Sequence, residues 1–195
     1  MTHTLNHLWA RGLELLGSEH AIMGGAMSWV SERNLVAALS NAGAFGVIAA
    51  SSMPPELLDI EIKETKKLLK TSTTHDSRLT THVPFGVNLI IMHPKLAELV
   101  EVCVANHVTH VVLAGGVPKG PTITRLKEGG AKVICFAPTA ALGKKLVKMG
   151  ADALIIEGAE AGGHIGPVST SVLAQEILPL IKEVPVFVAG GIGRG

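Results

Sequence analysis

The chain has 195 residues, 17 of them basic and 16 acidic, so we expect a single domain over residues 1–195. A formal net charge of +1 gives no electrostatic reason to expect nucleic acid or an anionic membrane as a partner, and we expect neither. Hydrophobic residues make up 47% of the chain and aromatic residues only 3%, so the apolar side chains are mainly aliphatic, which suits buried parallel strands.

Seven short apolar segments, separated by helical patterns, are the candidate strands. Several are apolar at nearly every position, as in Val111-Val112-Leu113, which is typical of strands that are covered on both faces. The seven segments are 21–26, 45–50, 85–90, 110–114, 132–137, 153–157 and 185–189.

Helix signals lie between these segments. Ser31 is expected to cap a helix that ends near Gly43, and Thr139 begins another. Apolar residues at helical spacing predict two more helices, over 94–106 and 171–182.

Strand and helix alternate along the chain, which requires right-handed crossovers and a parallel sheet. Such a sheet is either open and doubly wound or closed into a barrel. The barrel is favoured because polar or glycine-rich residues follow nearly every candidate strand, and because no early strand carries a complete GxGxxG motif. We therefore predict an α/β fold, a TIM-type (β/α)8 barrel.

The expected barrel is incomplete. A closed barrel has eight strands and typically about 250 residues, whereas Gly195 comes directly after the seventh candidate strand. We expect about seven of the eight strands in a C-terminally truncated domain whose first and last strands expose unpaired edges. Truncation, a pseudogene product and a partner chain that supplies the remainder are the alternatives.

The segment 157–166, EGAEAGGHIG, follows a candidate strand at the barrel face where active sites lie. Paired glycines before His164 let the backbone approach a flat ligand closely, and an imidazole exchanges protons near neutral pH. His164 is therefore the candidate catalytic residue. The alternative is a loop histidine that is hydrogen-bonded to the backbone.

Three further segments suit a flat, phosphorylated ligand. The segment 188–195, VAGGIGRG, opens from a strand into glycines whose N–H groups can cradle a phosphate. Small residues in 22–29 would let a planar cofactor lie against the backbone, although Met27 and Trp29 fit a core equally well. Asn88 is an amide inside an apolar strand and needs partners, either on a flavin ring or within the barrel.

Cys103 and Cys135 are far apart and form no CxxC pair, which argues against a disulfide framework or a zinc site. Both are expected to be small core residues, and no metal site is predicted. The amino terminus lacks the pattern of a signal peptide, and no apolar run approaches the roughly 20 residues of a membrane span. We expect a cytoplasmic protein.

Three motifs, FGVNL, EAGGHIG and VFVAGGIGRG, occur in that order. With them, residues 21–195 resemble the nitronate monooxygenases, formerly called 2-nitropropane dioxygenases, and their relatives the FMN-dependent enoyl-acyl-carrier-protein reductases. The resemblance implies FMN at the mouth of a TIM-type barrel. It also implies that a small-molecule nitronate is oxidised with oxygen to a carbonyl compound and nitrite.

The resemblance implies roles for individual residues. His164 matches the active-site histidine of the family, which interacts with the nitronate or assists proton transfer. Asn88 would bond the flavin ring. The other cofactor-binding positions would line the ring or receive the phosphate: Gly25, Ala26, Met27, Ala161, Gly162, Gly163, Gly190, Gly191 and Gly193.

The sequence departs from the family in two places, because a glutamine near Gly24 and a lysine near Phe136 are replaced. The Gly-Thr pair of the family, its second phosphate-binding element, would lie beyond Gly195, so we expect the chain alone to bind FMN weakly or not at all. Three functions stay open: nitronate oxidation, NAD(P)H-dependent reduction of an enoyl thioester, and an inactive fragment of such an enzyme. A homo-oligomer is compatible with all three.

Overall fold

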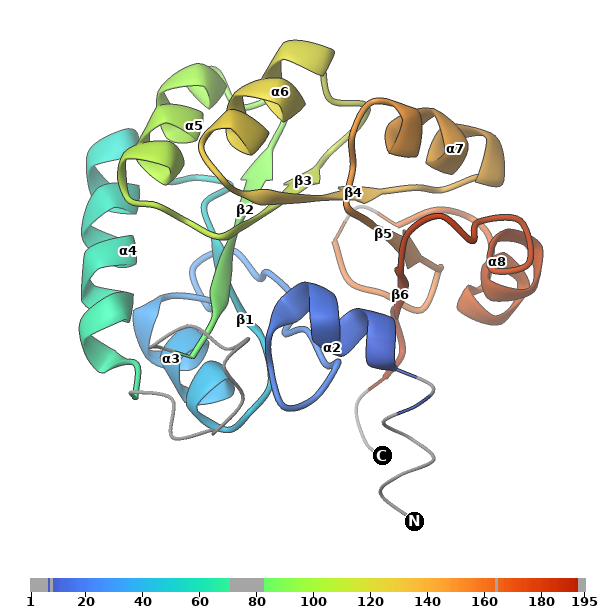
Figure 1. The fold of residues 1–195 in the computed structure, drawn as a ribbon, viewed down its shortest axis with the longest axis horizontal. Helices are drawn as coiled ribbons and strands as arrows, with labels where there is room; N and C mark the ends of the chain where they lie inside the picture. Colours follow the sequence, from blue (N-terminus) through green and yellow to red (C-terminus); the bar gives the residue numbers. More distant parts are fainter. Residues whose placement is uncertain (1–6, 8, 71–82, 164, 193–195) are drawn as a thin grey trace.

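The computed structural model describes residues 7, 9–70, 83–163 and 165–192. Within these ranges parallel strands alternate with helices, none of which is long and apolar enough to cross a membrane (Figure 1). The strands are β1 (Gly46–Ala49), β2 (Phe85–Ile90), β3 (His110–Ala114), β4 (Lys132–Phe136), β5 (Ala153–Glu157) and β6 (Val186–Ala189). The helices are α2 (Ala10–Leu16), α3 (Arg33–Asn41), α4 (Pro55–Leu68), α5 (Leu96–Ala105), α6 (Gly120–Glu128), α7 (Ala140–Lys148) and α8 (Thr170–Ile177).

The strand order identifies the architecture. The six strands form one sheet in the order β1-β2-β3-β4-β5-β6, and every neighbouring pair is parallel. A doubly wound sheet reverses its order at a switch point, and this sheet does not. The sheet curves, and helices α3 to α8 lie along its outer side (Figure 1). The predicted incomplete (β/α) barrel is therefore confirmed.

The first expected strand, 21–26, is reduced to a single bridge. Met23 pairs with Phe45 in the parallel sense, and the flanking bonds run from Phe45 N to Ile22 O and from Gly24 N to Phe45 O, both at 2.9 Å. Two glycines follow Met23, and glycine weakens a strand because it has no side chain to pack. The seven expected strand positions are thus six strands and one bridge in the described part of the chain.

Each face of the sheet is buried in its own apolar cluster. The inner cluster contains Leu16, Phe45, Val47, Val112, Ile134, Ala153 and Ile155. Alternate residues of the same strands, such as Val111, Leu113 and Leu154, are fully buried against the helices in the outer cluster. Burial of a side chain of this size contributes about 1.5–3 kcal/mol. Because both faces are covered, the strands read as continuous apolar runs.

Both cysteines belong to the outer cluster. Cys103 on α5 is 1% exposed and Cys135 on β4 is 0% exposed, and neither forms a disulfide. Burial raises the pKa of each thiol to about 12. The expectation that they are small core residues is confirmed, and at neutral pH neither supplies the thiolate that a nucleophile or metal ligand requires.

Helix α2 closes the amino-terminal end of the barrel. Leu16 is fully buried in the inner cluster, and the His110 side chain at the start of β3 bonds α2 through Nε2 to Leu15 O at 2.8 Å. A carbonyl only accepts, so Nε2 carries the proton and Nδ1 accepts from Thr109 Oγ1 at 2.9 Å. The neutral imidazole is therefore fully paired, and burial lowers the pKa of His110.

We expect the stability of the protein to fall as the pH is lowered through about 6.5, the usual pKa of histidine in an unfolded chain. Because the folded-state pKa of His110 is lowered, the unfolded chain takes up the proton first. The free energy of unfolding then falls by at most about 1.4 kcal/mol per pH unit. Urea unfolding between about pH 7.5 and 5.5 measures this slope, which His110→Gln should reduce. Exposed His20 provides the control variant His20→Gln, and equal slopes in all three proteins would contradict the assignment.

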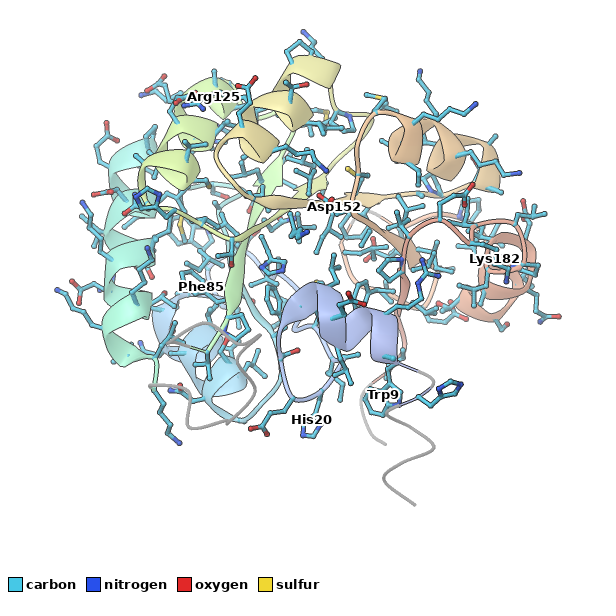
Figure 2. The ribbon with its side chains drawn as sticks, viewed as in Figure 1. Trp9, His20, Phe85, Arg125, Asp152 and Lys182 are labelled. Carbon is cyan, nitrogen blue, oxygen red and sulfur yellow. The ribbon has the colours of Figure 1, made fainter. Side chains whose placement is uncertain are left out.

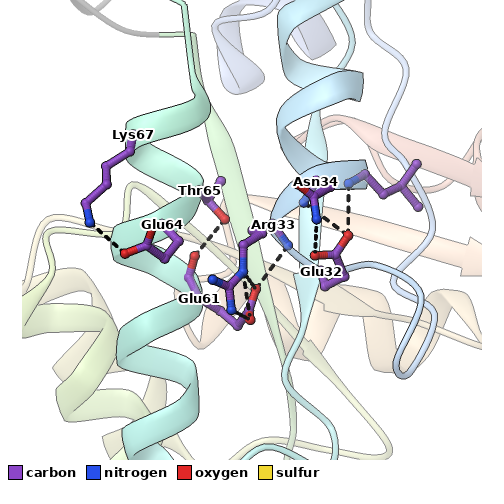
Figure 3. A network of polar contacts seen from close by, with 8 residues as sticks. Glu32, Arg33, Asn34, Glu61, Glu64, Thr65 and Lys67 are labelled. Atoms are coloured by element: carbon purple, nitrogen blue, oxygen red, sulfur yellow. Dashed lines mark hydrogen bonds and ion pairs between the residues drawn. The ribbon is translucent and has the colours of Figure 1, made fainter.

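An ion pair between Arg33 and Glu61 joins α3 to α4 (Figure 3). The guanidinium of Arg33 bonds both carboxylate oxygens of Glu61, whose side chain is 7% exposed, and Arg33 N also donates to Glu61 Oε2 at 3.0 Å. The hydrogen bond to Glu61 raises the pKa of Arg33. The pair therefore fixes the start of α3 and, with it, the end of the loop that precedes this helix.

Candidate functional site

The sequence-predicted site residues that the structure describes lie at one end of the sheet. Because all six strands are parallel, their carboxyl ends form one rim. Asn88 lies in the second half of β2, and the loop 25–27 follows the Met23 bridge. Residues 161–163 follow β5, and residues 190–191 follow β6. His164 and Gly193 lie outside the described residues.

The loop after β5 contacts the turn after β6. A Cβ placed on Gly190 would lie 3.0 Å from both Ala161 N and Ala161 Cβ, and one on Gly191 would lie 3.0 Å from Glu160 Cβ. Gly158 N also donates to Ala189 O at 3.3 Å. Two segments that sequence analysis singled out separately thus form one continuous surface.

The glycines of this surface have conformations that other residues adopt poorly. Gly190 and Gly191 have φ angles of +107° and +72°, and Gly163 has +85°. Backbone N–H groups of a turn that follows a strand can donate to an anion. At Gly162 and Gly163 an added Cβ would meet nothing within 4 Å, so the backbone is open to a ligand on that side. The arrangement fits a phosphate beside a planar group.

The predicted cap of α3 is wrong by one residue. Ser31 is expected from the sequence to cap this helix, but the carboxylate of Glu32 accepts from Asn34 N at 3.1 Å and from Leu35 N at 3.4 Å. The hydroxyl of Ser31 is unavailable because it bonds the preceding loop, and the residue is only 3% exposed.

Ser31 instead holds the predicted ring-lining loop in place. Its Oγ donates to Gly25 O at 2.9 Å and accepts from Met27 N at 3.0 Å. Its carbonyl accepts from Ala49 N, at the end of β1, at 3.0 Å. Sequence reasoning missed this role, and a serine with a helix start directly after it gives no signal of the loop contact. Gly25, Ala26 and Met27 are exposed as a result.

Asn88 points into the barrel beside this loop. It is 5% exposed and pairs in register with Ala49, while Ala50 N donates to Asn88 O at 3.0 Å. Its side-chain Nδ2 donates to Val112 O at 3.4 Å, which is long for a hydrogen bond. Among the described residues, this long bond is the one that the side-chain amide donates. Strands β3 and β4 separate the group formed by Asn88 and the first loop from the group on β5 and β6.

Large apolar side chains are exposed on the loops of the same rim. Trp29 is 67% exposed and has a φ of +62°, a strained conformation that is frequent at functional sites. The sequence leaves open whether Met27 and Trp29 belong to the core, and their exposure places both at the surface. The set comprises Met27 (49%), Trp29 (67%), Met92 (70%), Val117 (45%), Ile165 (49%) and Ile192 (73%). We call these six side chains the apolar rim.

At the opposite, amino-terminal end of the sheet, a charged side chain makes bonds that stabilise the fold. Asp152, labelled in Figure 2, precedes β5 and accepts from Val133 N and from Lys127 Nζ, each at 2.8 Å. These bonds join neighbouring strands and a helix, as expected for the stabilising face of a barrel. Within the described ranges no group of three or more metal-ligating side chains occurs at either end.

A profile of the nitronate monooxygenase family matches residues 11–103 and 97–195. Among curated proteins, a (3aS,4S,5R,7aS)-5-hydroxy-7a-methyl-1-oxo-octahydro-1H-indene-4-carboxyl-CoA dehydrogenase of Mycobacterium tuberculosis is 36% identical over 93% of this chain and 49% of its own length.

Two solved structures share the fold. FabK of Thermotoga maritima superposes with a TM-score of 0.82 and 38% identity, over 93% of this chain and 54% of the other. The nitroalkane oxidase of Streptomyces ansochromogenes gives 0.78 and 26%, over 93% and 61%. The chain thus spans about half the length of the curated relatives it matches first.

Proposed function

The chain belongs to the nitronate monooxygenase family, and from this premise we propose that it is an FMN-dependent oxidoreductase that oxidises alkyl nitronates. Members of the family are flavin-dependent. The observation that carries the proposal is the contact between residues 158–163 and the Gly190–Gly191 turn at the barrel rim. The N–H groups of this turn would be available to a phosphate beside an open backbone surface.

The residues of the rim fit FMN. The turn at Gly190 and Gly191 would hold the phosphate through backbone N–H groups. The loops 25–27 and 161–163 would lie against the ring, and Asn88 would bond its polar edge. When bound, FMN supplies the electron transfer from a nitronate to oxygen, with a carbonyl compound and nitrite as the products.

The protein itself would bind the substrate and move a proton. His164 follows the open backbone of Gly162 and Gly163 in sequence, and its imidazole would exchange a proton with the substrate. The apolar rim would exclude water from the reacting atoms, which strengthens electrostatic interactions there. Asn88 would fix the orientation of the ring. In this proposal His164 would transfer the proton, and backbone groups together with Asn88 would bind the cofactor.

A second candidate is the oxidation or reduction of an acyl thioester. Identity is 36% to the CoA-thioester dehydrogenase and 38% to FabK, against 26% to the nitroalkane oxidase. The apolar rim also suits the apolar acyl group of a thioester. A third candidate is an inactive fragment.

An assay at millimolar FMN separates the three candidates. Oxygen uptake and nitrite release with propyl-2-nitronate, without NADH, would support nitronate oxidation. Consumption of NADH with a crotonyl thioester, and no turnover of the nitronate, would select the reductase. A protein that shows no cooperative thermal transition with or without FMN, and turns over neither substrate, would be the inactive fragment.

We expect Asn88→Leu to weaken FMN binding several-fold without destabilising the protein. The leucine has the same branching as asparagine, and the hydrogen bond that the amide donates to Val112 O is long, at 3.4 Å. FMN fluorescence titration and urea unfolding measure the two effects. If the variant lost about 1–3 kcal/mol of stability and bound FMN normally, Asn88 would be a structural polar residue of the barrel.

A further inference from the structure

Glu160 connects the loop after β5 to the start of α8. Its carboxylate Oε2 accepts hydrogen bonds from Thr170 N at 2.7 Å and from Thr170 Oγ1 at 2.8 Å. Ser169 occupies the cap position of α8 but makes no side-chain capping bond to the helix. The first N–H group of this helix is therefore capped by Glu160, which lies ten residues earlier in the sequence in the loop after β5.

Thr170 is the place where three segments meet. A Cβ on Gly158 would lie 2.2 Å from Thr170 N, and one on Gly190 would lie 3.1 Å from Thr170 Oγ1. A Cβ on Gly191 would lie 3.0 Å from Glu160 Cβ. The Glu160–Thr170 contact thus lies between the loop after β5, helix α8 and the glycine turn after β6.

The bonds at Glu160 suit an ionised carboxylate. Hydrogen bonds from the backbone and side chain of Thr170 lower the pKa of Glu160. Both donors converge on the same oxygen, Oε2. A glutamine side chain has the same length and one acceptor oxygen, so it can keep this geometry without the charge.

We propose that Glu160 is a positioning residue that holds the loop 158–163 against the Gly190–Gly191 turn, so that the two segments form one phosphate cradle. Glu160 acts through Thr170 and does not itself contact the ligand. The identity of the ligand, FMN, rests on the proposed function. The connection between the loops is a property of the free protein and is tested separately.

Amide hydrogen exchange in the free protein tests the connection. Ala159 N donates to Val168 O at 2.9 Å, and Ala161 N donates to Gly158 O at 3.1 Å, so both amides report on the loop. Loss of a helix cap and of the bonds that order a loop should accelerate exchange of these amides by roughly 3- to 30-fold in Glu160→Ala. Glu160→Gln and Thr170→Ser should keep the wild-type rates. Thr170→Val removes the hydroxyl donor but keeps the backbone N–H donor, so it should accelerate exchange less than Glu160→Ala.

Titration with FMN then tests the consequence for binding. We expect Glu160→Ala to raise the Kd for FMN about tenfold and Thr170→Val to raise it by less, because the backbone N–H bond to Glu160 remains. Glu160→Gln and Thr170→Ser should have near-normal values. Glu176→Ala is the matched control, because Glu176 is an exposed carboxylate on α8 itself. If Glu160→Ala lowers the melting temperature, the comparison of Thr170→Val with Thr170→Ser decides the same point.

Three results would overturn parts of the proposal in distinguishable ways. Unchanged exchange at Ala159 and Ala161 in Glu160→Ala would remove the connection between the loops. Faster exchange together with an unchanged Kd would remove its role in binding. A wild-type protein with no FMN binding at millimolar concentration would overturn the proposed function and the ligand of the cradle, while the exchange rates would still decide whether Glu160 holds the loops together.

Discussion

Replacement of His164 by alanine is expected to lower the turnover of the FMN-loaded protein by roughly 10²- to 10⁴-fold, the usual contribution of a general acid or base. The imidazole is the one group of the EAGGHIG segment that titrates near neutral pH. FMN binding should change little, because the proposed cradle consists of backbone N–H groups. Steady-state assays at millimolar FMN with the nitronate and the thioester measure turnover.

The control for this variant is His20→Ala, which removes an exposed histidine outside the rim. It should leave turnover and the Kd for FMN unchanged. Normal turnover in His164→Ala would remove the catalytic assignment and leave a loop histidine. A large rise in the Kd for FMN would instead identify His164 as part of the binding surface.

Replacement of Gly190 by alanine is expected to raise the Kd for FMN tenfold or more, which corresponds to about 1.4 kcal/mol or more of binding free energy. At a φ of +107° an alanine is strained by about 1–3 kcal/mol. Its Cβ would also lie 3.0 Å from Ala161 N, so the loop after β5 would have to give way by a few tenths of an ångström. Fluorescence titration with FMN, alongside urea unfolding, separates loss of binding from loss of stability.

Gly130→Ala is the matched control for backbone strain. Gly130 has a φ of +85°, an added Cβ there would meet nothing within 4 Å, and the residue precedes β4 at the opposite end of the barrel. It should lose stability without losing FMN affinity. If both variants bound FMN equally well, the turn after β6 would have no part in the site.

The strands were predictable because a strand that is buried on both faces is apolar at nearly every position. Val111 and Val112 face opposite sides of the sheet, yet both are buried, so the run is apolar throughout. The predicted first strand lacks such a run beyond Met23, since two glycines follow. There the chain leaves the sheet after a single bridge.

The parts of the site that depend on tertiary contacts were not predictable. Ser31 was expected to cap a helix, but Gly25 O lies within reach of its hydroxyl only once the loop is folded. Glu160 gave no signal, because its partner Thr170 is brought near by the packing of α8. The exposure of Trp29 was not predictable either, because an apolar residue on a surface loop and one in a core cannot be distinguished in the sequence.

The most direct test of the account is an amide exchange footprint of the wild-type chain at millimolar FMN. The flavin site proposed at the carboxyl rim predicts slower exchange at residues 25–27, 161–163 and 190–191. It predicts no change at the amino-terminal end, around Leu15 and His110. Protection confined to that opposite end would contradict the proposed flavin site.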